Sequence, residues 1–157
     1  MSREPGALDF YGLLRTLLEH DAEFVLIGGF ALGFHGVPRG TKDVDIVPDP
    51  NPANMTRLWG ALESLEASPV EHADRAFEGG NSAYDTRLGR LDLMPDVIGV
   101  ESYEELRANA VKAELRELGR PIWIAGRDDL VTMKQEAGRP QDLIDVQALR
   151  MAEGLEE

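Results

Sequence analysis

The stretch FVLIGGFALGFHGVPRGTKDVDIVP, residues 24–48, decides the fold. It opens with four apolar residues, 24–27, which predict a buried strand. The pair Gly28-Gly29 ends this strand, and the apolar segment 30–34 that follows predicts a short helix. A glycine pair where a strand becomes a helix lets the backbone approach a phosphate, whose negative charge the helix N-terminus favours. Taken alone, the pair is equally compatible with a simple turn.

The second half of the stretch carries two acidic residues in an alternating pattern. Residues 43–47 alternate between polar and apolar side chains, which is typical of a half-buried strand. Because side chains alternate faces along a strand, Asp43 and Asp45 share one face. A third acid, Asp92, lies between two leucines in a later strand. If that strand lies beside the first, three carboxylates converge, and their repulsion predicts a divalent cation between them.

The rest of the chain predicts alternating helices and strands. Helices are expected over residues 8–20, 52–65, 102–106, 127–137 and 141–152, and strands forming hairpins over 82–87 with 91–94 and over 109–119 with 121–124. We expect one domain over residues 1–157, with a core of about 8–98 and a C-terminal hairpin and helices over about 99–153. Trp59 and Trp123, which lie among apolar residues, are expected in the hydrophobic core.

Composition limits the classes of function. The chain has 29 acidic and 16 basic residues, a formal charge of −13, which opposes dedicated DNA binding. It has no cysteine, which excludes disulfides and thiolate metal sites, and its three histidines show no metal-ligand spacing. No apolar run is long enough to span a membrane, so we expect no membrane partner and a cytoplasmic location.

Several further motifs accompany the glycine pair and the acids. They are His35-Gly36, Arg39-x-Thr41-x-Asp43-x-Asp45, Asp129-Leu130-Val131-x-Met133-Lys134 and Arg139-Pro140-x-Asp142-Leu143-x-Asp145-Val146-x-x-Leu149. In this order and spacing they resemble the nucleotidyltransferase fold of the DNA polymerase beta superfamily. The likeness is to its small bacterial branch, which includes abortive-infection toxins and minimal nucleotidyltransferases, and it spans nearly the whole chain.

The resemblance implies an α/β (α+β) fold, a mixed twisted sheet flanked by helices with a C-terminal helical pair. It implies transfer of a nucleoside monophosphate from an NTP to an acceptor hydroxyl, with Mg²⁺ or Mn²⁺ as cofactor. By the same resemblance Asp43 and Asp45 bind the metal, and Asp92 binds metal or acts as general base. The nucleotide contacts it implies are Gly28, Gly29, Arg39, Thr41 and Lys134. Asp142 and Asp145 lie three residues apart, so they share a helix face and can orient Lys134 or Arg139.

The acceptor stays open at this point, and three functions compete. The first is modification of RNA, such as tRNA, or of protein, as one partner of a toxin–antitoxin or phage-defence pair. The second is adenylylation of an aminoglycoside or lincosamide antibiotic, since an acidic surface suits a cationic drug. The third is a non-catalytic module that binds a nucleotide or a partner protein. A purely structural role also stays open for some of these residues. Asp92 can be an ordinary strand residue and Lys134 a solvated lysine, and Asp142 and Asp145 can serve only to stabilise the fold.

Overall fold

The computed structural model describes residues 7–71 and 80–155 of the 157-residue chain. Its helices are α1 (Phe10–Glu19), α2 (Gly28–Phe34), α3 (Pro52–Ser64), α4 (Tyr103–Ala108), α5 (Arg127–Ala137) and α6 (Pro140–Leu155). Its strands are β1 (Phe24–Ile27), β2 (Val44–Pro48), β3 (Ser68–Pro69), β4 (Ser82–Thr86), β5 (Gly89–Leu93), β6 (Val111–Glu114) and β7 (Pro121–Ile124). The expected elements are therefore present, with ends shifted by a few residues.

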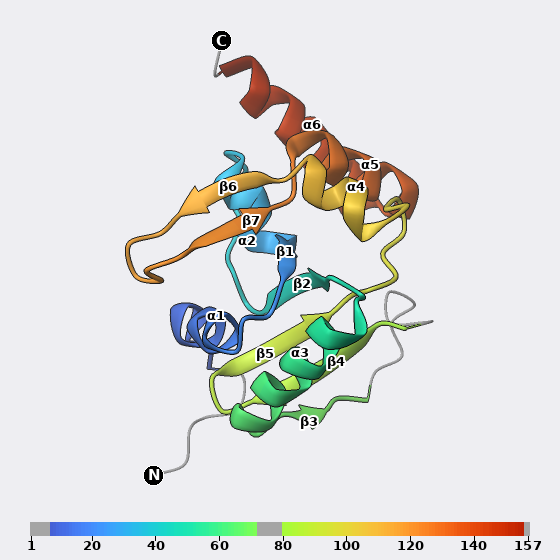
Figure 1. Cartoon of the computed structure of the whole chain (residues 1–157). Helices are drawn as coiled ribbons and strands as arrows, with labels where there is room; N and C mark the ends of the chain where they lie inside the picture. Colours follow the sequence, from blue (N-terminus) through green and yellow to red (C-terminus); the bar gives the residue numbers. More distant parts are fainter. Residues whose placement is uncertain (1–6, 72–79, 156–157) are drawn as a thin grey trace.

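The strands form one mixed seven-stranded sheet in the order β3-β4-β5-β2-β1-β7-β6. The pairs β1–β7 and β2–β5 are parallel, and the remaining four pairs are antiparallel. Both expected hairpins, β4–β5 and β6–β7, are observed. Helices flank the sheet (Figure 1), and α6 is an outer element whose C-terminal half extends away from it. The predicted mixed sheet flanked by helices is confirmed.

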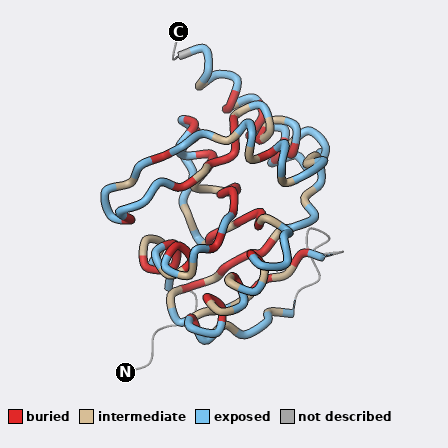
Figure 2. The backbone as a smooth tube through the Cα atoms, in the orientation of Figure 1, coloured by how far each residue is buried: buried red, intermediate tan, exposed pale blue. Residues whose placement is uncertain are grey.

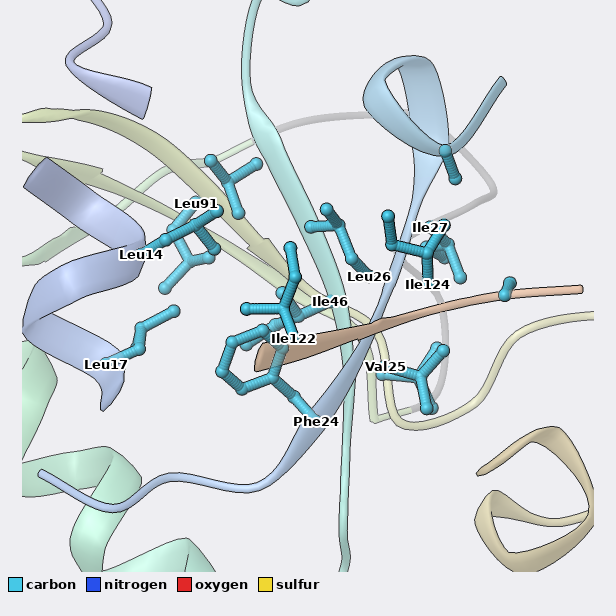
Figure 3. Close-up of a cluster of buried hydrophobic side chains, with 14 of the residues drawn as sticks. Leu14, Leu17, Phe24, Val25, Leu26, Ile27, Ile46, Leu91, Ile122 and Ile124 are labelled. Carbon is cyan, nitrogen blue, oxygen red and sulfur yellow. The ribbon is translucent and has the colours of Figure 1, made fainter. Parts of the chain in front are cut away.

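The core lies on the central strands. All four residues of β1 are buried, as expected for a strand with neighbours on both sides and helices over it. Leu14 and Leu17 of α1 point toward the strands that carry Phe24 and Leu91 (Figure 3), and each of these two leucines is fully buried. Buried residues are concentrated along these strands, whereas most residues at the end of α6 are exposed (Figure 2).

Helix ends follow local sequence chemistry. Asp9 caps α1 by accepting a hydrogen bond from the Gly12 backbone N–H at 2.9 Å. Ser102 caps α4 by accepting from the Glu105 N–H at 3.1 Å, at the spacing of a capping box. In the described residues, no helix is both long and apolar enough to cross a membrane.

One core prediction is wrong. Trp59 on α3 is 48% exposed, and its ring meets that of Tyr84 on β4 edge-on, with 6.4 Å between the ring centroids. Trp123 is half-buried against the core, and the Arg107 guanidinium lies 3.3 Å from its ring centroid. Trp59 therefore lies at the surface beside an aromatic partner, whereas Trp123 packs against the edge of the core.

Candidate active site

Strand register brings three carboxylates together. Strands β2 and β5 are parallel neighbours, and Asp45 lies directly opposite Asp92. Asp43 precedes β2 by one residue and Asp45 by two, so it is on the same face as Asp45. One carboxylate oxygen from each of the three lies within 4.8 Å of the others. The predicted convergence of these side chains is thus observed.

Gly28 faces this acidic cluster. Its φ is +78°, a conformation that residues with a side chain rarely adopt. A Cβ built at this position would lie 1.9 Å from Oδ2 of Asp45, which leaves no room for any side chain. The glycine therefore allows the strand-to-helix turn and also the close approach of the Asp45 carboxylate to the start of α2.

Crowding changes the acidity of two of the three carboxyls. Burial, the hydrogen bond with Asp92 and the charges of Asp43 and Asp92 raise the pKa of Asp45 to about 9. Burial and the charge of Asp92 also raise the pKa of Asp43. Neighbouring Arg90 opposes both changes. The chain thus holds carboxyl groups in a place that disfavours their charge.

Arg90 is a site residue that the sequence analysis missed. Its Nε donates a hydrogen bond to Oδ1 of Asp92 at 2.8 Å. It precedes Asp92 by two residues on β5, so strand periodicity alone places both on one face. With all three acids ionised, the three carboxylates and one guanidinium carry a net charge of −2.

A divalent cation fits this arrangement. Carboxylate oxygens are the ligands that Mg²⁺ and Mn²⁺ prefer, and one or two carboxylates with substrate phosphates commonly hold Mg²⁺. A charge of +2 would balance the net −2 of the cluster and offset both the burial and the repulsion that raise the pKa of Asp45. Asp43, Asp45 and Asp92 are therefore the residues able to hold the ion.

The loop between α2 and β2 lies over the second glycine of the pair. A Cβ on Gly29 would lie 3.2 Å from the Gly40 carbonyl oxygen and 3.5 Å from Cγ of Arg39. The same Cβ would be 3.9 Å from Cα of Thr41. Arg39 and Thr41, two of the nucleotide contacts that the resemblance implies, thus lie beside the diglycine turn.

Lys134 and Arg39 reach the acidic residues of α6. Arg39 pairs with Asp145, and Nζ of Lys134 lies 3.0 Å from Oδ2 of Asp145 and 3.4 Å from Oδ1 of Asp142. Arg139 also pairs with Asp142, at 2.7 Å. Burial acts to raise the pKa of Asp142, but the hydrogen bonds and charges of Arg139 and Lys134 outweigh it and hold that pKa below its ordinary value. Both acids contact Lys134, as the expectation that they orient Lys134 or Arg139 requires. Only Asp142 pairs with Arg139, and Asp145 pairs instead with Arg39.

His35 links the end of α2 to the segment that follows β7, the strand beside β1 on the side away from β2. It caps the C-terminus of α2, and its Nε2 lies 2.8 Å from the carbonyl oxygen of Ala125, just after β7. The ring is 7% exposed. The sequence analysis gave this residue no specific partner, because the contact joins positions 90 residues apart.

Two solved structures share this fold. The lincosamide antibiotic adenylyltransferase LnuA with lincomycin bound superposes with a TM-score of 0.62 at 14% identity, covering 92% of this chain and 98% of that one. ANT(2″)-Ia in complex with adenylyl-2″-tobramycin gives 0.58 at 18% identity, covering 92% and 87%. At such identities the likeness establishes the fold.

Two sequence relatives are much longer proteins. Acetyl-coenzyme A synthetases of Cupriavidus pinatubonensis and Cupriavidus taiwanensis are 29% identical over 122 residues and 28% identical over 120. These matches cover 69% and 68% of this chain, but the chain spans 18% of each relative.

A family model decides membership. The model described as "Nucleotidyltransferase of unknown function (DUF6036)" matches residues 11–156, nearly the whole chain and every site residue above. The acid cluster, the diglycine turn and the fold agree with that match. The chain belongs to this nucleotidyltransferase family.

Proposed function

We propose that this protein is a metal-dependent nucleotidyltransferase that moves a nucleoside monophosphate from an NTP to a hydroxyl of an acceptor. The observation that carries the proposal is the meeting of Asp43, Asp45 and Asp92 beside the Gly28 turn. Family membership supports the reaction class. Buried carboxyls that raise one another's pKa lower the stability of the fold unless a ligand balances their charge, so their presence supports a ligand-binding role.

Asp43 and Asp45 hold the cation, and Asp92 is either a third ligand or the general base. A divalent ion supplies charge stabilisation to the phosphates of the NTP and to the attacking oxygen. Asp92 is 6% exposed and is hydrogen-bonded to Arg90, which fixes the direction of its carboxylate. A carboxylate held in this way can accept a proton from a hydroxyl brought within hydrogen-bond distance.

The transfer forms and breaks one bond to phosphorus. The acceptor oxygen attacks the α-phosphorus, the bond from that phosphorus to the bridging oxygen of the β-phosphate breaks, and pyrophosphate leaves with the electron pair. The hydroxyl proton passes to Asp92 in the general-base version of the proposal. Gly28 and Gly29 place the triphosphate through the backbone at the start of α2, Arg39 and Lys134 are cations for it, and Thr41 steadies the loop before Asp43.

Labelled nucleotides test the proposal. We would incubate the protein with α-labelled ATP, CTP, GTP or UTP, Mg²⁺ or Mn²⁺, and tRNA, protein or antibiotic acceptors. The expected result is label on one acceptor with wild type and none with the double variant Asp43→Asn/Asp45→Asn. Glu63→Gln, an exposed acid on α3, is the matched control. Full activity of the double variant would show that the metal site has been assigned wrongly.

The acceptor class separates the remaining candidates. LnuA was solved with lincomycin bound and ANT(2″)-Ia in complex with adenylyl-2″-tobramycin, and this likeness favours an antibiotic acceptor. The sequence resemblance to abortive-infection toxins favours tRNA or a cognate protein. NTP binding with no transfer to any acceptor supports the non-catalytic module. A toxin or antitoxin gene beside this one supports the toxin–antitoxin role.

A further inference from the structure

Asp145 joins two parts of the molecule that lie far apart in the sequence. It is on α6, 1% exposed, and contacts Arg39 from the loop beside the diglycine turn and Lys134 from α5. Gln141 also donates a hydrogen bond to Oδ1 of Asp145, at 3.1 Å. Both cations that we propose for the triphosphate therefore end on one buried carboxylate.

The course of the Arg39 side chain gives this contact its meaning. Its Cγ lies 3.5 Å from the position a Cβ would take on Gly29, so the side chain packs beside the diglycine turn and its guanidinium pairs with Asp145. About a third of the side chain is exposed. A guanidinium carries five N–H donors, so the contact with Asp145 leaves donors for a phosphate placed over Gly29.

Asp142 is a natural comparison for Asp145. The two acids lie three residues apart on α6, each is 1% exposed, and each contacts Lys134. Asp142, however, accepts hydrogen bonds from the guanidinium and the backbone N–H of Arg139. In the described part of the chain it forms no ion pair or hydrogen bond with Arg39. The acids share burial and charge, and differ in whether they hold the loop arginine.

We infer that Asp145 is a positioning residue that fixes Arg39 beside the diglycine turn, so that the C-terminal helix sets the affinity of the site for the triphosphate. This inference rests on the proposed function, because it needs an NTP at Gly28 and Gly29. Asp142 acts on Lys134 and Arg139 and supports the α5–α6 pair. Loss of Asp145 frees Arg39 to leave the turn, whereas loss of Asp142 does not.

A double-mutant cycle tests this role. The affinity of wild type for ATP, CTP, GTP and UTP with Mg²⁺ is measured by calorimetry, and the tightest-binding NTP is used with Asp145→Asn, Asp142→Asn, Arg39→Ala and the two doubles with Arg39→Ala. We expect Asp145→Asn to weaken binding about tenfold, and to have a clearly smaller effect in the Arg39→Ala background, where only its contact with Lys134 is left to lose. Asp142→Asn should act to a similar extent with or without Arg39.

Thermal unfolding separates positioning from support. Both Asn variants remove a buried charge, so both should lower the melting temperature, and a merely structural role predicts equal losses of affinity. If Asp145→Asn does not fold, Asp145→Glu, which keeps the charge and displaces it by one methylene, enters the same cycle. Additive effects of residues 39 and 145 on NTP affinity overturn the inference alone. Failure of wild type to bind any NTP overturns the proposed function and this inference with it.

Discussion

Replacing Asp45 by Asn should stabilise the protein in the absence of metal. The pKa of Asp45 in the folded chain is about 9, against 3.8 for an ordinary aspartate, because the carboxyl is buried beside Asp92 and Asp43. An acid whose pKa rises on folding holds its proton longer in the folded chain than in the unfolded one. Its contribution to the free energy of unfolding therefore falls as pH increases from about 4 to about 9.

The size of the effect follows from the pKa difference. Each pH unit above the unfolded pKa lowers the free energy of unfolding by about 1.4 kcal/mol, an upper limit of about 4 kcal/mol at pH 7. Partial contact of Asp45 with water reduces this, so we expect a gain of about 1–4 kcal/mol for Asp45→Asn. For a chain of this size that corresponds to a melting temperature higher by about 3–12 °C.

Thermal unfolding from pH 5 to pH 9 measures the difference. In a chelator, the gap between Asp45→Asn and wild type should widen as pH rises. With Mg²⁺ or Mn²⁺ it should narrow, because the cation stabilises only the protein that keeps the carboxylate. Glu63→Gln serves as the control and should show no widening. A variant that melts below wild type, or a difference in melting temperature that does not change with pH, would refute the claim that the ionised cluster destabilises the fold without a cation.

Three further substitutions test other parts of the account. Gly28→Ala puts a Cβ 1.9 Å from the Asp45 carboxylate at a residue with a positive φ. Nucleotidyl transfer should therefore fall at least 100-fold, and the free energy of unfolding should fall by about 2–4 kcal/mol. Gly29→Ala is the comparison and should have much smaller effects on both quantities. Lys134→Ala should raise KM for the NTP about tenfold with a smaller change in kcat, as steady-state kinetics would show; an unchanged KM would exclude a phosphate contact. His35→Ala removes a buried ring with a 2.8 Å hydrogen bond and should lower the free energy of unfolding by about 2–4 kcal/mol in urea titrations, whereas a loss below about 0.5 kcal/mol would show that the contact is not structural.

Local patterns in the sequence were sufficient to choose the three acids of the cluster, although not to show that they meet. Alternation along residues 43–47 put Asp43 and Asp45 on one face, and the leucines around Asp92 marked a strand whose polar residue points the same way. What the alternation could not supply was the order of the strands. The pairing of β2 with β5 was therefore only a condition of the prediction, since it joins segments separated by a helix and two strands.

Contacts over long sequence distances were harder to predict. Arg39 and Asp145 are 106 positions apart, and only the fold brings them together. The place of Arg90 could have been predicted, because it lies two residues before Asp92 on the same strand and therefore on the same face. Trp59 was predicted in the core because its neighbours in the sequence are apolar. Leu58 and Leu62 are buried residues of the same helix, and Trp59 lies outside the face that they form.

The central claim is that Asp43, Asp45 and Asp92 together hold a divalent cation. Crystals grown with Mn²⁺ and an NTP, measured at a wavelength where manganese scatters anomalously, test it directly. The account predicts an anomalous peak about 2.0–2.3 Å from carboxylate oxygens of at least two of the three aspartates, next to the triphosphate. Bound NTP with no peak between these side chains, or with manganese coordinated elsewhere in the protein, would contradict it.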